Sequence, residues 1–242
     1  MVKASLTMAT HDEPVVWHTL IAWGKGTEPS ADQLNRLVNW TLNRQELAVW
    51  QLPKASARSV IVARAALLQS VCARLDFGEI SLSVVGHWTD WIVLLWTLWL
   101  PLAERMHRQQ QAHQSTDQPV FIQGILGAQG TGKTTLTQIL CLILGCLGQR
   151  AVSLSIDDLY LSYAERCELK RQDPRLIWRG PPGTHDVSLG VQTLSALKRC
   201  DANQSVLIPQ FDKSLWGGEG DRIESKPVNS PTIVLFEGWF IG

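Results

Sequence analysis

Apolar and polar residues alternate in two different ways along this chain, and the change comes near residue 120. Before that point apolar residues recur at helical spacing, first over 34–42 and again over 60–75. A polar run and a proline follow, which is typical of a linker. The pattern therefore predicts a mostly helical N-terminal region over 1–112 and a linker at 113–119.

From residue 120 onward, short apolar runs typical of strands are separated by helical segments. The clear runs lie at 120–126, 151–156 and 232–236, and a weaker one lies at 205–208. Residues 133–147 are apolar on nearly every face, as expected of a helix buried against a sheet, with Gly145 and Gly148 ending it. Strands that alternate with helices predict an α/β unit over 120–242, with a parallel sheet flanked by helices.

The most apolar stretch of the chain is WIVLLWTLWL, residues 91–100. Asp90 and Glu104 bound it, and it is shorter than the roughly 20 apolar residues that span a bilayer. We expect a buried helix and no membrane partner. Of the 11 Trp, only Trp178, Trp216 and Trp239 lie in the second half. The others are expected to pack the N-terminal helices, because aromatic side chains bury large apolar areas.

Charge and cysteine content narrow the class of protein. The 242 residues carry 22 basic and 22 acidic side chains, so the chain lacks the basic surplus of a nucleic-acid-binding protein. At 45% apolar and 18% charged it is expected to fold around a core. The five Cys lack the spacing of a zinc site or a disulfide scaffold, and the first residues lack a secretory signal. We therefore expect reduced thiols in a cytoplasmic protein.

A complete phosphate-binding loop, GAQGTGKT, follows the first predicted strand and opens the next helix. It matches GxxxxGK[ST] in the context that this motif requires, so the sheet is predicted to be of the P-loop NTPase type. Its glycines let successive N–H groups face one point, and the helix N-terminus adds partial positive charge. Lys133 is expected to reach the β- and γ-phosphates of a nucleotide, and the Thr134 hydroxyl to bind Mg²⁺. The predicted nucleotide-binding residues are Gly127, Ala128, Gln129, Gly130, Thr131, Gly132, Lys133, Thr134 and Thr135.

Acidic residues stand at the ends of the two later parallel strands, where ligands bind in sheets of this type. Asp157 and Asp158 follow the second strand, and alternation suggests that they point in different directions. One is expected to accept the proton of an attacking hydroxyl and the other to contact Mg²⁺-bound water, and the residues leave open which does which. Capping of the next helix is the alternative, although Ser162 and Glu165 already form a capping box there. Glu237 is predicted to act on Mg²⁺ through water.

Two charged, turn-rich segments, RGPPGTHD and IPQFDKS, are expected to close over an anionic substrate. Arg179 and Lys213 are predicted to meet a carboxylate or phosphate, and His185 a hydroxyl. Asp186 is equally suited to cap a helix over 187–199. The segment GGEGDR is expected to be mobile and to become ordered on substrate binding. The full set of candidate substrate residues is Tyr160, Arg179, His185, Asp212, Lys213 and Arg222.

Taken together and in this order, GAQGTGKTT, SIDDLY, RGPPGTHD, IPQFDKS, GGEGDR and LFEGW resemble the D-glycerate 3-kinase family. That family belongs to the phosphoribulokinase and uridine kinase branch of phosphate-loop kinases, and the resemblance runs from Phe121 to the last residue. It implies a phosphotransferase with an alcohol acceptor that uses ATP and Mg²⁺ to convert D-glycerate to 3-phosphoglycerate. In photosynthetic organisms this reaction ends the photorespiratory glycolate route.

The same resemblance implies more parallel strands than the three clear ones in this sequence. The kinase core is therefore expected to be incomplete at its C-terminus. Two other interpretations stay open: a uridine or pantothenate kinase-like enzyme, and a nucleotide-binding remnant without catalysis. Nothing in the sequence indicates the oligomeric state.

Overall fold

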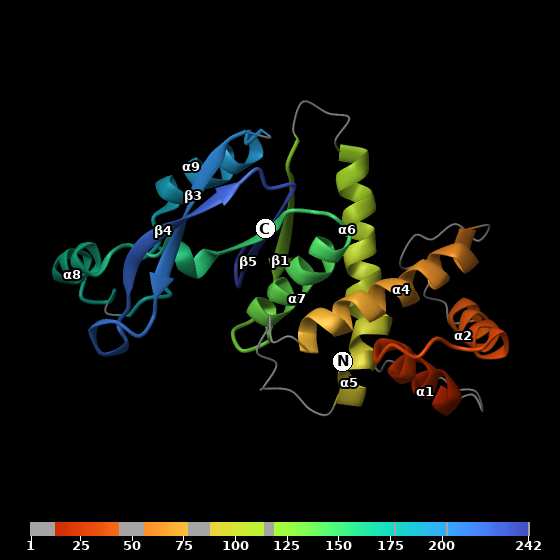
Figure 1. Cartoon of the computed structure of the whole chain (residues 1–242). Helices are drawn as coiled ribbons and strands as arrows, with labels where there is room; N and C mark the ends of the chain where they lie inside the picture. Colours follow the sequence, from red (N-terminus) through yellow and green to blue (C-terminus); the bar gives the residue numbers. More distant parts are fainter. Residues whose placement is uncertain are drawn as a thin grey trace. The chain divides into compact units, whose positions relative to one another are not determined.

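The computed structural model describes residues 13–43, 56–76, 88–113, 119–176, 178–201 and 203–241. The chain divides into two compact units, Met1–Arg105 and Met106–Gly242. The division falls within a helix, α6 (Leu100–His113) (Figure 1). Most of the predicted linker at 113–119 lies outside the described residues, so its boundaries stay a prediction.

The described part of the first unit is helical, as predicted. Its elements are α1 (Glu13–Gly24), α2 (Ala31–Asn43), α4 (Ala57–Asp76), α5 (Trp88–Leu94), the π-helical turn η2 (Leu95–Trp99) and the first residues of α6. Helix α1 packs against α2, α4 and α5, and the apolar faces of these helices form the core of the unit.

Tryptophans contribute much of that core. The buried ones are Trp23, Trp40, Trp91, Trp96 and Trp99. Trp17 meets Trp40 edge to face, with ring centroids 5.0 Å apart. Trp50 and the side chain of Trp88 lie outside the described residues. The apolar stretch 91–100 is helical and mostly buried, in agreement with the prediction. None of the helices in the described ranges has both the length and the apolar character needed to cross a membrane.

The second unit is built on a parallel sheet of three strands in the order β1-β5-β2. These strands, β1 (Phe121–Leu126), β2 (Ala151–Ser155) and β5 (Ile233–Gly238), lie within two residues of the predicted runs. Helix α7 (Lys133–Cys146) packs against β2 and β5. Leu197 of α9 (Val187–Lys198) joins Leu154 and Val234 of the sheet in one buried cluster. The predicted α/β fold, a parallel sheet flanked by helices, is confirmed.

Short-range interactions define the ends of these helices. Helix α7 continues through Gly145, so the predicted stop at that residue is wrong, whereas Gly148 takes a left-handed φ of 77° just beyond the helix. Helix α8 (Tyr163–Gln172) starts with the predicted capping box of Ser162 and Glu165. Asp186 caps α9 by accepting the Leu189 N–H at 2.8 Å.

An antiparallel hairpin of β3 (Ser205–Asp212) and β4 (Asp221–Asn229) departs from the sequence-based prediction. The sequence predicts a short strand at 205–208 and turns from there to residue 222, whereas only residues 213–220, including η4 (Trp216–Gly218), connect the two strands. The physical reason is that β4, DRIESKPVN, is mostly exposed or half-buried along its length. It therefore lacks the regular apolar alternation by which strands are recognised.

Candidate active site

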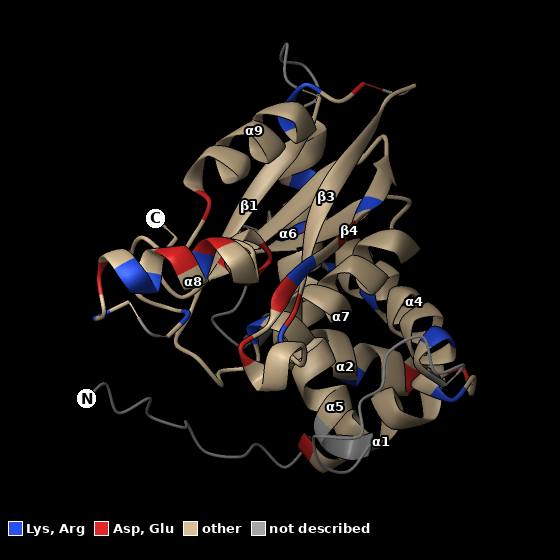
Figure 2. Cartoon of the chain, turned by 90° about the vertical axis from the view of Figure 1, so that its left-hand side faces the viewer, with Lys and Arg blue, Asp and Glu red and all other residues tan. Residues whose placement is uncertain are grey.

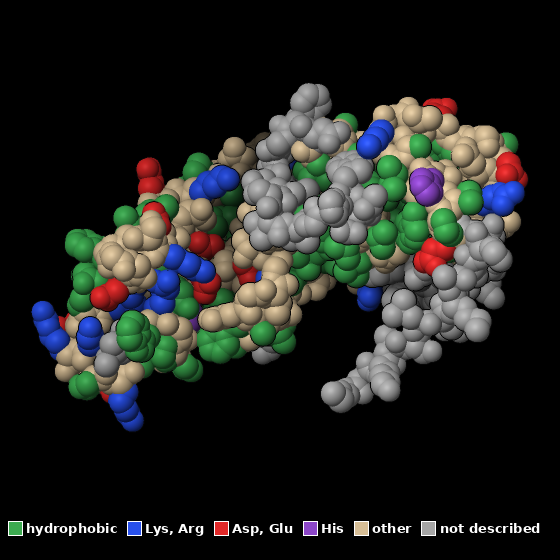
Figure 3. Space-filling view, turned by 90° about the horizontal axis from the view of Figure 1, so that it is seen from below, with side chains coloured by type: hydrophobic (Ala, Val, Ile, Leu, Met, Phe, Trp, Pro, Cys, Tyr) green, Lys and Arg blue, Asp and Glu red, His purple; other side chains and the backbone are tan. Residues whose placement is uncertain are grey.

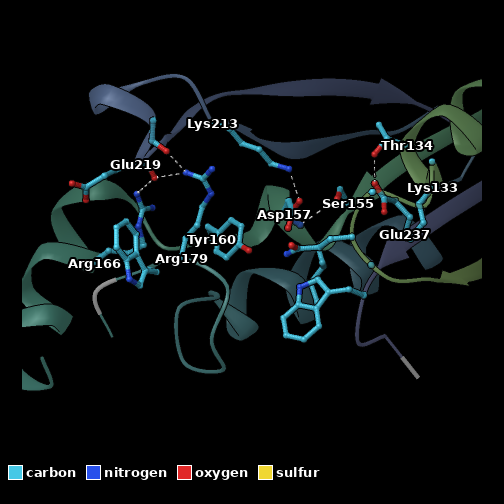
Figure 4. A pocket seen from close by; sticks show the side chains of 18 of the residues that line it. Lys133, Thr134, Ser155, Asp157, Tyr160, Arg166, Arg179, Lys213, Glu219 and Glu237 are labelled. Carbon is cyan, nitrogen blue, oxygen red and sulfur yellow. Dashed lines mark hydrogen bonds and ion pairs between the residues drawn. The ribbon is translucent and has the colours of Figure 1, made fainter. Parts of the chain in front are cut away.

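The carboxyl ends of the three parallel strands meet at one edge of the sheet. There Leu126 is paired with Gly238, and Ser155 with Glu237. A cavity of about 760 Å³ opens at this edge, which is where α/β proteins of this kind bind ligands. Its walls come from the phosphate loop, the 3-10 turn η3 (Ile156–Leu159), α8, the hairpin turn and the end of β5 (Figure 4).

The phosphate loop has the backbone geometry that its glycines predict. Gly130 and Gly132 take left-handed φ angles of 74° and 80°, which a residue with a side chain adopts only at a cost. A Cβ at Gly127 would lie 3.0 Å from Thr131 Oγ1, so the loop is closely packed. Lys133 Nζ donates to the Ala128 carbonyl at 2.8 Å. The predicted nucleotide-binding residues that line the cavity are Gln129, Gly130, Gly132, Lys133, Thr134 and Thr135.

The residues predicted to act on Mg²⁺ lie in the same cavity. Thr134 Oγ1 donates to Glu237 Oε1 at 2.9 Å, and Glu237 is only 3% exposed at the end of β5. The described residues contain no group of three His, Cys, Asp or Glu that could hold a metal ion. Mg²⁺ beside a nucleotide needs few protein ligands, because phosphate oxygens and water supply most of its coordination shell. The hydroxyl, the carboxylate and the loop therefore fit ATP with Mg²⁺.

Asp157 and Asp158 have different surroundings, although they are adjacent. Asp158 accepts the N–H groups of Ser155 at 3.1 Å and of Phe211 at 3.2 Å, and burial raises the pKa of its carboxyl. Asp157 lines the cavity, where its Oδ2 lies 2.6 Å from Lys213 Nζ. Asp158 therefore joins η3 to β3, and Asp157 is the carboxylate that faces a ligand.

The six candidate substrate residues separate into two groups. Tyr160, Arg179 and Lys213 line the cavity. Burial, followed by the charge of Asp157, raises the pKa of the Tyr160 phenol. The other three, His185, Asp212 and Arg222, are not among the lining residues.

These three residues support the walls of the cavity. His185 is 9% exposed and stacks on Tyr160 with ring centroids 4.2 Å apart, and burial lowers its pKa. Asp212 accepts the Ser214 N–H at 2.8 Å in the hairpin turn. Arg222 donates to the Tyr160 carbonyl at 2.9 Å and to Asp186 at 3.2 Å.

Several lining residues escaped prediction from the sequence. They are Arg166, Cys167, Lys170 and Glu219. Figure 2 shows that α8 carries acidic and basic residues along its length, so Arg166 has no local feature that separates it from its neighbours. Its 8% exposure is the distinguishing property, and that depends on contacts with the hairpin turn. Trp178 is 75% exposed beside the cavity.

A phosphate loop between a parallel strand and a helix, with carboxylates at the next strand ends, defines a nucleotide-binding protein of the P-loop class. No family model matches the sequence. The chain is 36% identical over 134 residues to a chloroplastic D-glycerate 3-kinase of Arabidopsis thaliana, a match that covers 52% of the chain and 29% of the relative. It is 41% identical over 130 residues to the uncharacterized kinase mug58 of Schizosaccharomyces pombe, covering 50% of the chain and 47% of the relative.

Among solved structures, a D-glycerate 3-kinase from Cryptococcus neoformans is 34% identical, with a TM-score of 0.49, over 57% of this chain and 50% of that one. The chain thus spans less than half the length of each of the two curated relatives and half of this structure. The resemblance to D-glycerate 3-kinases that the motifs indicate is confirmed by sequence identity over about half of the chain.

Proposed function

We propose that this chain belongs to an ATP-dependent small-molecule kinase that phosphorylates D-glycerate to 3-phosphoglycerate. The observation that carries the proposal is the position of Asp157. This carboxylate lines the same cavity as a complete phosphate loop, and Lys213 lies beside it (Figure 4). The similarity to D-glycerate 3-kinases supports the choice of acceptor. A photorespiratory role in photosynthetic organisms is part of the same proposal.

Four polar side chains of the cavity have a role in this reaction. Bound ATP with Mg²⁺ would supply the phosphoryl group and the metal charge. Thr134 and Glu237 would hold Mg²⁺, with Glu237 acting through water, and Lys133 would place positive charge at the β- and γ-phosphates. Asp157 accepts the proton of the acceptor hydroxyl while the hydroxyl oxygen bonds to phosphorus and ADP leaves. The substrate is a small molecule. The five cysteines are present as thiols, which supports a reducing compartment, and we propose the cytoplasm.

The test is ATP consumption by the purified chain with D-glycerate, compared with L-glycerate, uridine and pantothenate. We expect turnover with D-glycerate, and a preference for uridine or pantothenate would replace the acceptor but keep the kinase. Lys133→Ala should lower turnover at least about 10²-fold, because it removes charge stabilisation in the transition state. Lys226→Ala, an exposed substitution on β4, is the matched control. Unchanged turnover in Lys133→Ala would refute the site.

A further inference from the structure

The cavity has a second polar end, away from the phosphate loop. In Figure 4, Arg166 and Arg179 lie on one side of Tyr160, and Asp157 with Lys213 lies on the other, toward Lys133 and Thr134. Lys170, one turn after Arg166 on α8, lines the same cavity. Figure 3 shows Lys and Arg side chains, interspersed with Asp and Glu, over the left-hand part of the view.

The cations at this end carry charge that no carboxylate of the described residues pairs with. Among those residues, none of Arg166, Lys170 and Arg179 forms an ion pair, in contrast to the pairs Lys213–Asp157 and Arg222–Asp186. Asp221 and, more weakly, Glu219 act on Arg166 electrostatically, although neither lies within ion-pair distance of it. Burial lowers the pKa of Arg166, which is the expected effect when a cation is taken out of water.

Backbone carbonyls hold the two guanidinium groups in place. Arg179 Nη1 donates to the carbonyls of Gly218 and Glu219, each at 2.7 Å. Arg166 donates to the carbonyls of Leu161, Glu219 and Gly220. Both guanidinium groups also lie over the Phe211 ring, 5.2 Å and 5.9 Å from its centroid. These contacts orient the cations but do not neutralise them, so their charge stays available to an anion.

We propose that Arg166, Lys170 and Arg179 form a subsite for the anionic group of the acceptor, a carboxylate or a phosphate. The inference rests on the proposed function where it identifies the ligand as the acceptor. Binding of an anion at this site does not itself require catalysis. A hydroxy acid would place its carboxylate at the two arginines and its hydroxyl at Asp157, with Tyr160 between them. The subsite selects acceptors that carry an anionic group in addition to the reacting hydroxyl.

The test is direct binding to the 242-residue chain without ATP, measured by isothermal titration calorimetry. The ligands are D-glycerate, glycerol as the analogue without a carboxylate, and inorganic phosphate as the free alternative anion. We expect D-glycerate to bind and glycerol to bind at least about tenfold more weakly, because charge-assisted hydrogen bonds to the arginines are lost. Arg179→Gln should weaken D-glycerate binding by about tenfold or more.

Arg175→Gln is the matched control for Arg179→Gln, because both arginines lie in the connection between α8 and α9. Arg175 pairs with Asp173 and does not line the cavity. Because Arg166 is buried, we choose the conservative substitution Arg166→Lys, and circular dichroism should confirm that this variant is folded. It should also weaken binding, because a lysine cannot make the same set of hydrogen bonds. Wild-type affinity in Arg179→Gln, equal binding of glycerol, or binding of neither anion would overturn the subsite.

The two proposals fail in different ways. Phosphate binding that depends on Arg179, without D-glycerate binding, would support the anion subsite and remove D-glycerate as the acceptor. Lys133→Ala should leave D-glycerate affinity unchanged, since Lys133 belongs to the nucleotide end of the cavity. Loss of D-glycerate binding in Lys133→Ala would contradict the separation into two ends.

Discussion

Asp157 and Asp158 show how a single turn of backbone gives two neighbouring carboxylates different chemistry. The turn η3 directs Asp157 into the cavity and Asp158 onto the N–H groups of Ser155 and Phe211. The sequence predicts that both stand at the end of a strand and point in different directions. It could not say which one faces the ligand, because the Phe211 N–H that Asp158 accepts comes from β3, 53 residues later.

His185 is the residue where a sequence-based role and the structural surroundings differ most. Both ring nitrogens are buried and have no hydrogen-bond partner among the described residues. The ring stacks on Tyr160 and meets Phe240 edge to face at 5.3 Å. A neutral, buried imidazole of this kind acts as an aromatic packing group. His185 lies against Tyr160 because the two residues form an isolated antiparallel β-bridge through their backbones. No local sequence pattern encodes this pairing.

We predict that His185→Phe removes a source of acid sensitivity. Burial lowers the pKa of His185 below 6.5, although the charge of Asp157 opposes this in part. The unfolded chain therefore takes up a proton more readily, and stability is lost as the pH falls below about 6.5, by up to about 1.4 kcal/mol per pH unit. Urea denaturation between pH 8 and pH 5 should show this loss in the wild type and a smaller loss in His185→Phe. Parallel pH profiles for the two proteins would contradict the prediction.

At the scale of elements, the hairpin turn connects β3 to β4 and also completes the cavity. Its residues Trp216, Gly217, Gly218 and Gly220 all have positive φ angles, between 53° and 98°. The same turn contains residues 218–220, and Arg166 and Arg179 donate to the backbone carbonyls of these residues. The glycines are visible in the sequence as a turn. The hydrogen bonds to Arg166 are not, because they join segments more than 50 residues apart.

Two glycines of this turn should differ in their tolerance of a methyl group. Gly217 and Gly220 both have positive φ, so alanine at either position costs about 1–2 kcal/mol in backbone strain. At Gly217 the new Cβ would meet nothing within 4 Å. At Gly220 it would overlap the Phe211 ring and come within 2.9 Å of the Asp212 carbonyl oxygen. Urea denaturation should therefore show a larger loss of stability for Gly220→Ala, and equal losses would contradict this packing.

The sequence predicts the elements of the second unit unevenly, for a physical reason. Helices α7, α8 and α9 and the three parallel strands have strong local signals: buried apolar runs, a phosphate loop and capping residues. Strand β4 has none of these, because it pairs on one edge with β3 and is mostly exposed or half-buried. What local patterns predict is thus the nucleotide end of the cavity. The arginine end depends on how α8 and the hairpin meet.

At the scale of the whole molecule, the chain has two cores, and the candidate site belongs to one of them. The first unit is built on apolar helices rich in tryptophan, and the second on the parallel sheet and the cavity. A ligand that binds only the folded form of one unit stabilises that unit by mass action. Whether the other unit shares this stabilisation depends on whether the two unfold together.

We predict that ATP with Mg²⁺ slows amide hydrogen exchange in the second unit only. At a ligand concentration about 100 times its dissociation constant, the stabilisation is about 2.7 kcal/mol, or about 100-fold in the exchange rate of the most protected amides. Hydrogen exchange with mass spectrometry should show this in β1, α7 and β5, and no change in α1, α2 and α4. In Lys133→Ala the protection of the second unit should be lost. Equal slowing in both units would mean that they unfold as one, and slowing that persists in Lys133→Ala would place the nucleotide elsewhere.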